Sequence, residues 1–314
     1  MQMYATPVNK AFGMPEISDQ VMVDVFPVSD LVPAKDKDYH FDKEVLMLAL
    51  SFITSPYTGD GLYVYGEFGT GKTSSIGQIL SRLNYPTLML SWDENADSAD
   101  LIGSMGISFG DTTFNYGPLA LAMKEGYALV INEIDRGRGG NLVALNDVLD
   151  SGVLVIKETN EVIRPHPNFR LFVTANSAGS GDTTGKYVGS IRRLDPAFLD
   201  RFQFLKIDYM SPMKENAAMH KLFPDMSQVF IQKMVEFANS TRKTTEDDVS
   251  DLGIPMSTRT LKRSLRILRS YGIGSENRPC TSEDLLVPLN SSYMARLDDV
   301  GQDIAKTLLK TIFG

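Results

Sequence analysis

The feature that most constrains this chain is a glycine-rich loop at residues 66–73, which reads Gly-Glu-Phe-Gly-Thr-Gly-Lys-Thr. An apolar run, Leu62–Tyr65, precedes the loop, and apolar residues at helical spacing follow it. The glycines let the backbone turn tightly and point N–H groups at phosphate oxygens, and the start of the following helix adds a favourable dipole. Strand, loop and helix in this order predict a binding site for the phosphates of ATP.

Each part of this loop has an expected role. Lys72 would reach the β- and γ-phosphates, and the Thr73 hydroxyl would take a coordination position on Mg²⁺. The residues that we expect to bind the nucleotide are Gly66, Glu67, Phe68, Gly69, Thr70, Gly71, Lys72, Thr73 and Ser74.

Short apolar runs alternate with helical patterns over residues 31–210, which is typical of an α/β domain with a central parallel sheet flanked by helices. Two interruptions, at 106–116 with a turn at Gly110-Asp111 and at 153–164, look like hairpins. The expected strands of the sheet are Leu62–Tyr65, Thr87–Leu90, Ala128–Asn132, Arg170–Ala175 and Phe204–Ile207.

The rest of the chain differs in character. After Ser211-Pro212 the pattern is helical throughout, which predicts a smaller all-α lid domain with C-terminal helices at 211–314. Residues 1–30 mix proline, glycine and polar residues with short apolar pairs, and we expect no firm element in this N-terminal arm.

Composition excludes several classes of protein. No stretch approaches the roughly 18–20 apolar residues of a membrane-spanning helix, and the N-terminus lacks a secretory signal. One cysteine and three histidines make an internal disulfide impossible and argue against a structural zinc site. A net charge of −8 argues against binding nucleic acid by bulk electrostatics. We expect a cytoplasmic protein, in a bacterium or in the host cell of a phage that encodes it.

A second motif, Tyr127–Glu133, is an apolar run that ends in an amide and a carboxylate. Glu133, just past the strand end, is the expected general base for the attacking water. Asn132 is the expected second metal contact. ATPases with this type of phosphate loop usually have Asp at this position. An amide brings no negative charge, so we expect weaker Mg²⁺ binding and slower hydrolysis, which Asp135 would partly offset.

Three further polar residues complete the expected site. Asn176 follows the strand Arg170–Ala175 and would orient the attacking water, although Asn after a strand is also a common turn former. Arg201 would stabilise transition-state charge in a neighbouring subunit, with Arg192 and Arg193 as rivals and a surface pair with Asp200 as the plainer alternative. Arg259 opens a helix that Ser257 or Thr258 would cap, from which it would reach the nucleotide.

Together these motifs resemble the AAA+ ATPases of the MoxR branch, and are most similar there to the small ATPase subunits of aerobic cobaltochelatases, the CobS-like proteins. The similarity spans about residues 31–210, whereas most of the helical part resembles no family. The segments that carry it are Val32–Tyr39, Arg82–Pro86, Asp100–Gly103, Val162–Phe172, Thr174–Asn176, Gly181–Gly185, Tyr187, Gly189 and Asp200–Arg201.

The resemblance implies a hexameric ring that hydrolyses ATP at subunit interfaces, with Glu133 as base, Asn176 as sensor, Arg201 as finger and Arg259 as lid sensor. It also implies a partner protein with a von Willebrand factor A domain, and in the chelatases this assembly inserts Co²⁺ into a corrin ring. The chain departs from the family pattern at Asn132, and from the chelatase pattern at Lys186 and at Ile191–Arg193.

Three hypotheses about function therefore stand. The first is an ATP-driven motor that remodels a protein partner. The second is a regulatory scaffold that binds ATP but hydrolyses it slowly because of Asn132. The third is a nucleic-acid-dependent AAA+ machine that uses the basic face of residues 259–269, which the acidic balance of the chain disfavours.

Overall fold

The computed structural model describes residues 3–56, 59–108, 111–137, 142–182, 191–246, 252–276 and 280–314. Lys186, Tyr187, Gly189 and the turn residue Gly110 lie outside these ranges. The chain divides into two compact units. The first comprises Met1–Gly66 with Lys72–Ile207, and the second comprises Glu67–Gly71 with Asp208–Gly314, so each is described by itself.

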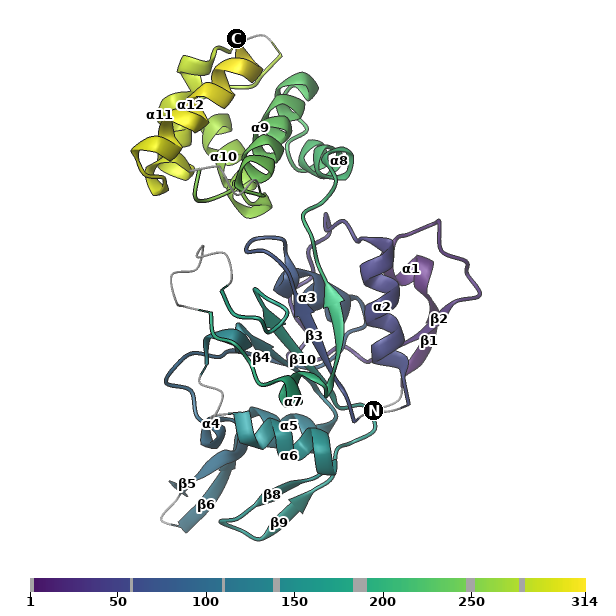
Figure 1. The fold of residues 1–314 in the computed structure, drawn as a ribbon. Coiled ribbons are helices and arrows are strands. Elements are labelled where there is room, and N and C mark those ends of the chain that lie inside the picture. Colours follow the sequence, from purple (N-terminus) through teal and green to yellow (C-terminus); the bar gives the residue numbers. More distant parts are fainter. Residues whose placement is uncertain are drawn as a thin grey trace. The chain divides into compact units, whose positions relative to one another are not determined.

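A five-stranded sheet forms the centre of the first unit (Figure 1). Its order is β11-β3-β10-β7-β4, and every neighbouring pair is parallel. The five predicted strands are confirmed, although β11 begins two residues earlier than expected. Their bounds are β3 Gly61–Tyr65, β4 Thr87–Ser91, β7 Ala128–Asn132, β10 Arg170–Ala175 and β11 Phe202–Lys206.

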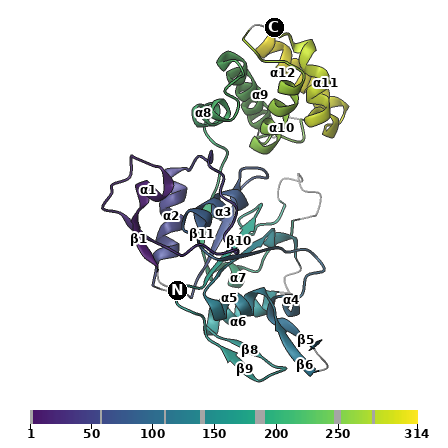
Figure 2. The ribbon, with the colours of Figure 1, turned by 180° about the vertical axis from the view of Figure 1, so that it is seen from behind.

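Helices cover both faces of this sheet (Figures 1 and 2). On one face Leu46 of α2 and Ile76 of α3 pack with Val64 of β3. On the other face Leu119 of α5 and Leu145 of α6 pack with those strand residues whose side chains point to that face. Burial on both faces explains why the central strands β3, β7 and β10 are largely apolar, whereas the edge strands β4 and β11 keep exposed positions. The helices of this unit beyond its N-terminus are α2 Lys43–Thr54, α3 Lys72–Arg82, α4 Ser98–Ile102, α5 Pro118–Glu125, α6 Val143–Ser151 and α7 Pro196–Leu199.

The expectation that the N-terminal residues contain no firm element is wrong. Strand β1 (Tyr4–Pro7) pairs antiparallel with β2 (Met22–Val25), and helix α1 (Val8–Phe12) lies between them in the chain. Apolar side chains from α1 and β2 join the core on the side of α2 and α3, which fixes these residues to the first unit. In the structure, buried and exposed residues alternate along β2. In the sequence, the matching pattern extends over only four residues, which is too short to indicate a strand.

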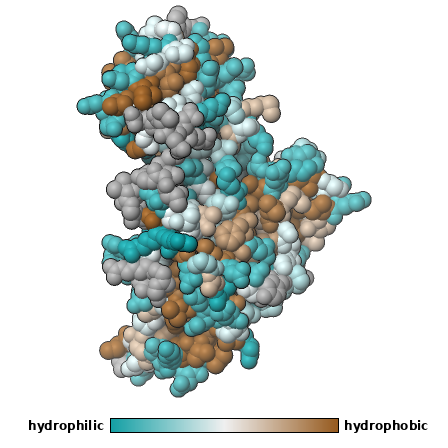
Figure 3. Space-filling view, viewed as in Figure 1, coloured by the Kyte–Doolittle hydropathy of each residue, from teal (hydrophilic) through white to brown (hydrophobic). Residues whose placement is uncertain are grey.

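Both predicted hairpins are confirmed, as β5 (Gly103–Ser108) with β6 (Asp111–Tyr116) and β8 (Leu154–Ile156) with β9 (Glu161–Ile163). Their side chains meet at Glu161, which accepts a hydrogen bond from the Tyr116 hydroxyl at 2.6 Å and from the Lys124 ammonium at 2.9 Å. The hairpins also expose apolar side chains, and hydrophobic patches appear in this region of Figure 3. These side chains are Met105, Ile107, Tyr116, Val155 and Val162.

The second unit is helical and has its own core, which includes Phe237, Leu265 and Leu309. Leu261, Leu265 and Leu268, which lie on one face of α10, are fully buried. Within the described residues, no helix has both the length and the apolar character needed to cross a bilayer. The helices are α8 Pro212–Leu222, α9 Gln228–Glu246, α10 Thr258–Ser270, α11 Ser282–Ser292 and α12 Asp299–Phe313.

Candidate nucleotide site

The candidate site lies at the carboxyl edge of the three central strands of the first unit. Gly66 follows β3, Asn132 and Glu133 stand at the end of β7, and Asn176 follows β10. Because β3, β10 and β7 are parallel neighbours, their carboxyl ends meet at one edge, where ligands of such sheets bind. The fold thus brings together Asn132, Glu133 and Asn176 with the first glycine of the loop.

The glycines of the loop adopt backbone conformations that other residues rarely do. Gly66, Gly69 and Gly71 have φ angles of 151°, 74° and 100°. At Gly66 a Cβ atom would also lie only 2.1 Å from the carbonyl oxygen of Ile207, so any side chain would be excluded there. Two constraints, one on φ and one on space, therefore require glycine where β3 turns into the loop.

Lys72, the first residue of α3, is held at the sheet edge. Its side chain is buried, and the ammonium donates to the Gly66 carbonyl at 2.8 Å and to Asn176 Oδ1 at 2.9 Å. The loop's lysine and the amide at the end of β10 are therefore in direct contact. This places a positive charge where the phosphates of a nucleotide bound to the loop would lie.

Asn132 is fixed by three hydrogen bonds that orient its amide. Its Oδ1 accepts from the Thr73 hydroxyl at 2.7 Å and from the Thr174 hydroxyl at 3.2 Å, while its Nδ2 donates to the Leu90 carbonyl at 3.2 Å. Oxygens of Thr73 and Asn132 thus converge, and neutral oxygens of this kind suit a hard cation such as Mg²⁺. Among the described residues no three His, Cys, Asp or Glu side chains gather as a metal cluster. A cation here would therefore depend on phosphate oxygens as well.

Changing Asn132 to aspartate is expected to strengthen Mg²⁺ binding and to raise ATP turnover about tenfold or more, because the new charge would face the cation. The second carboxylate oxygen would face the Leu90 carbonyl where Nδ2 now donates, so we also expect a stability loss of about 1–3 kcal/mol. A Mg²⁺ titration of turnover and a thermal melt measure the two effects. An unchanged rate would contradict the idea that the amide limits hydrolysis.

Glu133 occupies an unusual backbone conformation, with φ 59° and ψ 42°. A non-glycine residue in this left-handed region costs of order 1–3 kcal/mol, and such strain gathers at functional sites. The Glu133 amide donates to the Thr174 hydroxyl at 3.2 Å, and its half-exposed carboxylate pairs with Arg136 Nε at 3.0 Å. Thr174 therefore touches both Asn132 and Glu133. Our sequence reasoning gave it no role in the site, although a polar residue inside an apolar strand was a signal.

Asp135 lies deeper than expected. Its carboxyl group is fully buried, its Oδ2 accepts from the Asn176 amide at 2.7 Å, and its carbonyl accepts from the Arg192 amide at 2.7 Å. Burial raises the pKa of this carboxyl group, while the hydrogen bond from Asn176 and the charge of Lys72 act in the opposite direction. Asp135 thus links the end of β10 to the segment that carries Arg192.

Trp92, directly after β4, supports the same region. Its amide donates to the Asn132 carbonyl at 2.8 Å, and its side chain is 1% exposed. A Cβ atom on Gly137 would lie 2.0 Å from the indole ring, so the ring packs tightly against the backbone beyond Asp135. The indole is thus wedged between the end of β7 and the turn that follows it.

Arg201 lies at the opposite edge of the sheet. It directly precedes β11, its carbonyl accepts from the Gly61 amide at 3.2 Å, and Gly61 begins β3. Strands rise roughly 3.3 Å per residue, so a five-residue strand separates Arg201 from the carboxyl edge. Its guanidinium forms a two-pronged ion pair with Asp150 at 2.5 and 2.6 Å, a partner that the sequence did not suggest. This hydrogen bonding lowers the pKa of Asp150 and raises that of Arg201.

The two rival arginines lie on the other side of the unit from Arg201. Arg192 is tied by its amide to Asp135, near the carboxyl edge, and its guanidinium lies 3.4 Å from Glu94 Oε2. Arg193 is its exposed neighbour. The sequence made Arg192, Arg193 and Arg201 candidates for one role. In the structure Arg201 lies at the amino edge of the sheet, whereas Arg192 and its neighbour Arg193 lie near the carboxyl edge.

Arg259 belongs to the second unit, in the first turn of α10. Of the two N-cap candidates, Ser257 and Thr258, the structure shows Ser257 as the N-cap residue. Its hydroxyl accepts a hydrogen bond from the Thr260 amide at 3.2 Å. Within this unit Gly69 lies against the same turn, because a Cβ atom there would be 2.5 Å from Ser257 Cβ and 3.8 Å from Arg259 Cβ. The Tyr209 hydroxyl donates to the Phe68 carbonyl at 2.8 Å.

Comparison with known proteins agrees with this arrangement. A family model described as "AAA domain (dynein-related subfamily)" matches residues 61–202. Aerobic cobaltochelatase subunit CobS from Sinorhizobium sp. is 36% identical over 265 residues, which are 81% of this chain and 77% of that protein. The denitrification regulatory protein NirQ from Pseudomonas aeruginosa is 26% identical over 238 residues, 75% of this chain and 86% of NirQ.

Two further similarities are more limited. Von Willebrand factor A domain-containing protein 8 from Mus musculus is 21% identical over 226 residues, 68% of this chain but 11% of that protein. A mutant of RuvB from Thermotoga maritima has a similar fold, with a TM-score of 0.52 and 16% identity over 86% of this chain and 75% of that chain. Fold, site and relatives agree: the chain belongs to the AAA+ ATPases, within the MoxR branch that includes the CobS-like proteins.

Proposed function

We propose that this chain is the subunit of a ring-forming motor that uses ATP hydrolysis to remodel a protein partner. The observation that carries the proposal is the position of Lys72, which contacts both Gly66 and Asn176 at the sheet edge where Glu133 also stands. A phosphate-binding lysine, a carboxylate base and a polar sensor at one edge are the parts that ATP hydrolysis requires.

In this proposal the loop holds the phosphates with its backbone amides, and Lys72 moves from Asn176 to the γ-phosphate. Thr73 and Asn132 would hold Mg²⁺, which neutralises charge on the β- and γ-phosphates when bound. Glu133 takes the proton from the attacking water, and the Asn176 side chain, once released by Lys72, orients that water. The contact between Lys72 and Asn176 thereby makes the sensor respond to the nucleotide.

The ring follows from the position of Arg201. An arginine at the amino edge of the sheet is a strand's length from the carboxyl edge of its own chain, so we propose that it serves the site of a neighbouring subunit. Since every subunit then both receives and supplies an arginine, the contact is heterologous, and we propose that it closes as a hexameric ring.

We further propose that the partner carries a von Willebrand factor A domain. A mouse protein named for that domain contains a region similar to 68% of this chain, so the two modules occur in one polypeptide there. The CobS relative makes metal insertion by such an assembly the first partner activity to assay, and NirQ is named for a different task. These relatives are named for different tasks, so our proposal concerns the motor rather than any one substrate.

Changing Lys72 to alanine tests the proposal most directly. We expect ATP affinity to fall about 10- to 100-fold, because the variant loses a charge-assisted hydrogen bond to phosphate. Titration with a fluorescent ATP analogue measures affinity, and phosphate release with Mg²⁺ measures turnover. Lys43→Ala, which removes an exposed lysine at the start of α2, is the matched control. Equal ATP affinity in the wild type and Lys72→Ala would refute the proposed site.

The ATP-binding scaffold is a second candidate, and the amide of Asn132 favours it. A neutral ligand next to Thr73 binds the cation less strongly than a carboxylate does, which would slow hydrolysis without preventing nucleotide binding. Wild-type turnover separates the two candidates: a motor hydrolyses ATP well above the rate of the Glu133→Gln variant, whereas a scaffold requires a slow wild-type rate that Asn132→Asp then raises.

A further inference from the structure

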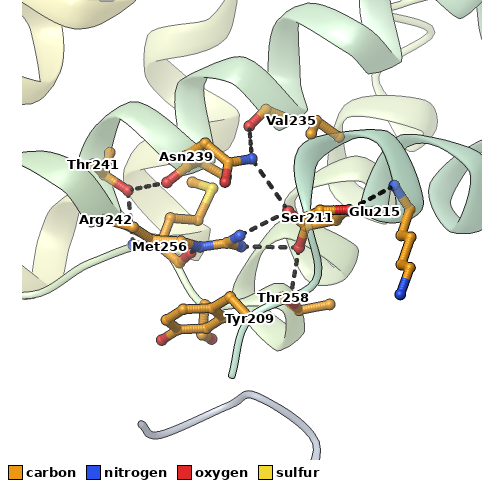
Figure 4. A network of polar contacts seen from close by, with 12 residues as sticks. Tyr209, Ser211, Glu215, Val235, Asn239, Thr241, Arg242, Met256 and Thr258 are labelled. Carbon is orange, nitrogen blue, oxygen red and sulfur yellow. Dashed lines mark hydrogen bonds and ion pairs between the residues drawn. The ribbon is translucent and has the colours of Figure 1, made fainter. Parts of the chain in front are cut away.

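A buried ion pair joins two helices of the second unit (Figure 4). Glu215 of α8 is fully buried, and Arg242 of α9 is 5% exposed. The guanidinium of Arg242 binds both carboxylate oxygens of Glu215, at 2.7 and 2.9 Å. Taking two charges out of water is costly, and apolar residues of similar size often stabilise a fold as well or better. The pair therefore needs an explanation beyond helix packing.

Asn239 of α9 also donates to Glu215 Oε2, at 3.4 Å, and two further hydrogen bonds of the pair reach the start of α10. Arg242 Nε donates to the Met256 carbonyl at 2.9 Å, and the Thr258 hydroxyl donates to Glu215 Oε1 at 2.6 Å. The Met256 amide donates to the Thr241 hydroxyl at 3.0 Å. Residues on both sides of the helix cap are thus held by groups from α8 and α9, and the next residue after Thr258 is Arg259.

The pair also contacts the segment that opens the second unit. The Arg242 guanidinium lies over the Tyr209 ring, 4.2 Å from its centroid, and Figure 4 shows this stacking. The hydroxyl of the same tyrosine donates to the carbonyl of Phe68, one of the loop residues Glu67–Gly71 that belong to this unit. One ion pair therefore touches both the backbone that precedes Arg259 and the tyrosine that binds the loop.

We infer that Glu215 and Arg242 are positioning residues that set the first turn of α10, and with it Arg259, relative to loop residues Glu67–Gly71 of the same unit. The inference rests on the proposed ATP-driven function and on the expectation, implied by the family resemblance, that Arg259 is the lid residue that contacts the nucleotide. Neither Glu215 nor Arg242 touches ATP in this account. They act indirectly, because they fix the geometry of the turn that carries Arg259, and Arg259 contacts the nucleotide.

A double-mutant cycle with Arg259 tests this inference. The single variants are Glu215→Gln, Arg242→Lys, Thr258→Val and Arg259→Ala, and each of the first three is also combined with Arg259→Ala. For each we would measure affinity for a fluorescent ATP analogue, steady-state turnover and the melting temperature. We expect the single variants to weaken ATP affinity by roughly the same factor as Arg259→Ala, about three- to tenfold. The double variants should then be no weaker than Arg259→Ala alone.

The outcomes separate positioning from a general loss of stability. Additive effects in the double variants, or an Arg259→Ala variant with normal affinity and turnover, would overturn the inference. If Glu215→Gln or Arg242→Lys does not fold, Thr258→Val decides, because it removes a single hydroxyl from the network. Arg269→Gln, which breaks the exposed ion pair with Asp225 at the other end of α10, is the control and should change neither ATP affinity nor turnover.

The same measurements keep this inference apart from the proposed function. A wild type that binds ATP without hydrolysing it would count against the motor alone, since the cycle in ATP affinity would still give its answer. Normal hydrolysis with an additive cycle would count against the inference alone.

Discussion

Changing Glu133 to glutamine is expected to lower the rate of ATP hydrolysis by about 10²–10⁴-fold while ATP affinity stays within a few fold. Glutamine keeps the size of the side chain but cannot accept the proton of the attacking water. The backbone should keep its left-handed turn, because Ile134 beyond it is fully buried and the Thr174 hydroxyl accepts from the amide of residue 133. Binding should persist, since the loop and Lys72 are untouched.

Phosphate release in a single turnover measures the chemical step, and titration with a fluorescent ATP analogue measures affinity. Glu125→Gln, at the exposed end of α5, makes the same chemical change away from the sheet edge and should leave both quantities unchanged. A Glu133→Gln variant with more than about a tenth of wild-type turnover would mean that another group accepts the proton.

Changing Arg201 to alanine is expected to lower turnover of the assembled protein by about 10³–10⁵-fold, the range typical of arginines that stabilise charge on a transferred phosphoryl group. In the single chain this guanidinium pairs with Asp150, so it must exchange that partner for the phosphate of the next subunit. Arg164→Ala, after β9, removes another exposed arginine and serves as the control. A loss below about tenfold would return the role to Arg192 or Arg193.

Mixing the two inactive variants distinguishes action in a neighbouring subunit from action in the same chain. Arg201→Ala subunits keep Glu133, and Glu133→Gln subunits keep Arg201. In a random one-to-one mixture about a quarter of the interfaces would combine both intact residues, so partial activity should return. No recovery, with mixed assemblies verified by size and by a tag on one variant, would contradict the proposal that Arg201 acts across an interface.

The sequence was most informative where local pattern and final position coincide. The three central strands of the sheet are largely apolar runs because both of their faces are covered, and such runs are visible without any tertiary information. Polar residues directly after those runs then had to meet at one edge, because parallel strands end together. Asn132, Glu133 and Asn176 were accessible to prediction for that reason.

What the sequence could not supply depends on contacts between distant residues. Nothing in the local pattern suggests that Arg201 pairs with Asp150, or that Arg242 pairs with Glu215 on another helix. The sequence suggested that Asp135 supplies a negative charge near the metal. In the structure its carboxyl group is buried and accepts a hydrogen bond from the backbone amide of Asn176, which gives it a structural role. The N-terminal strands were missed because four residues are too few for a reliable alternation, and their burial depends on a core formed by α2 and α3.

The position of Trp92 provides an optical reporter that needs no added label. It is the single tryptophan of the chain, and its amide is bonded to Asn132 while its ring packs on Gly137. Indole emission depends on the polarity and mobility of its surroundings, so excitation near 295 nm, about where tyrosine stops absorbing, observes this one place in the first unit. Movement of the Asn132–Gly137 turn during the ATPase cycle should therefore change the intrinsic fluorescence of the protein in real time.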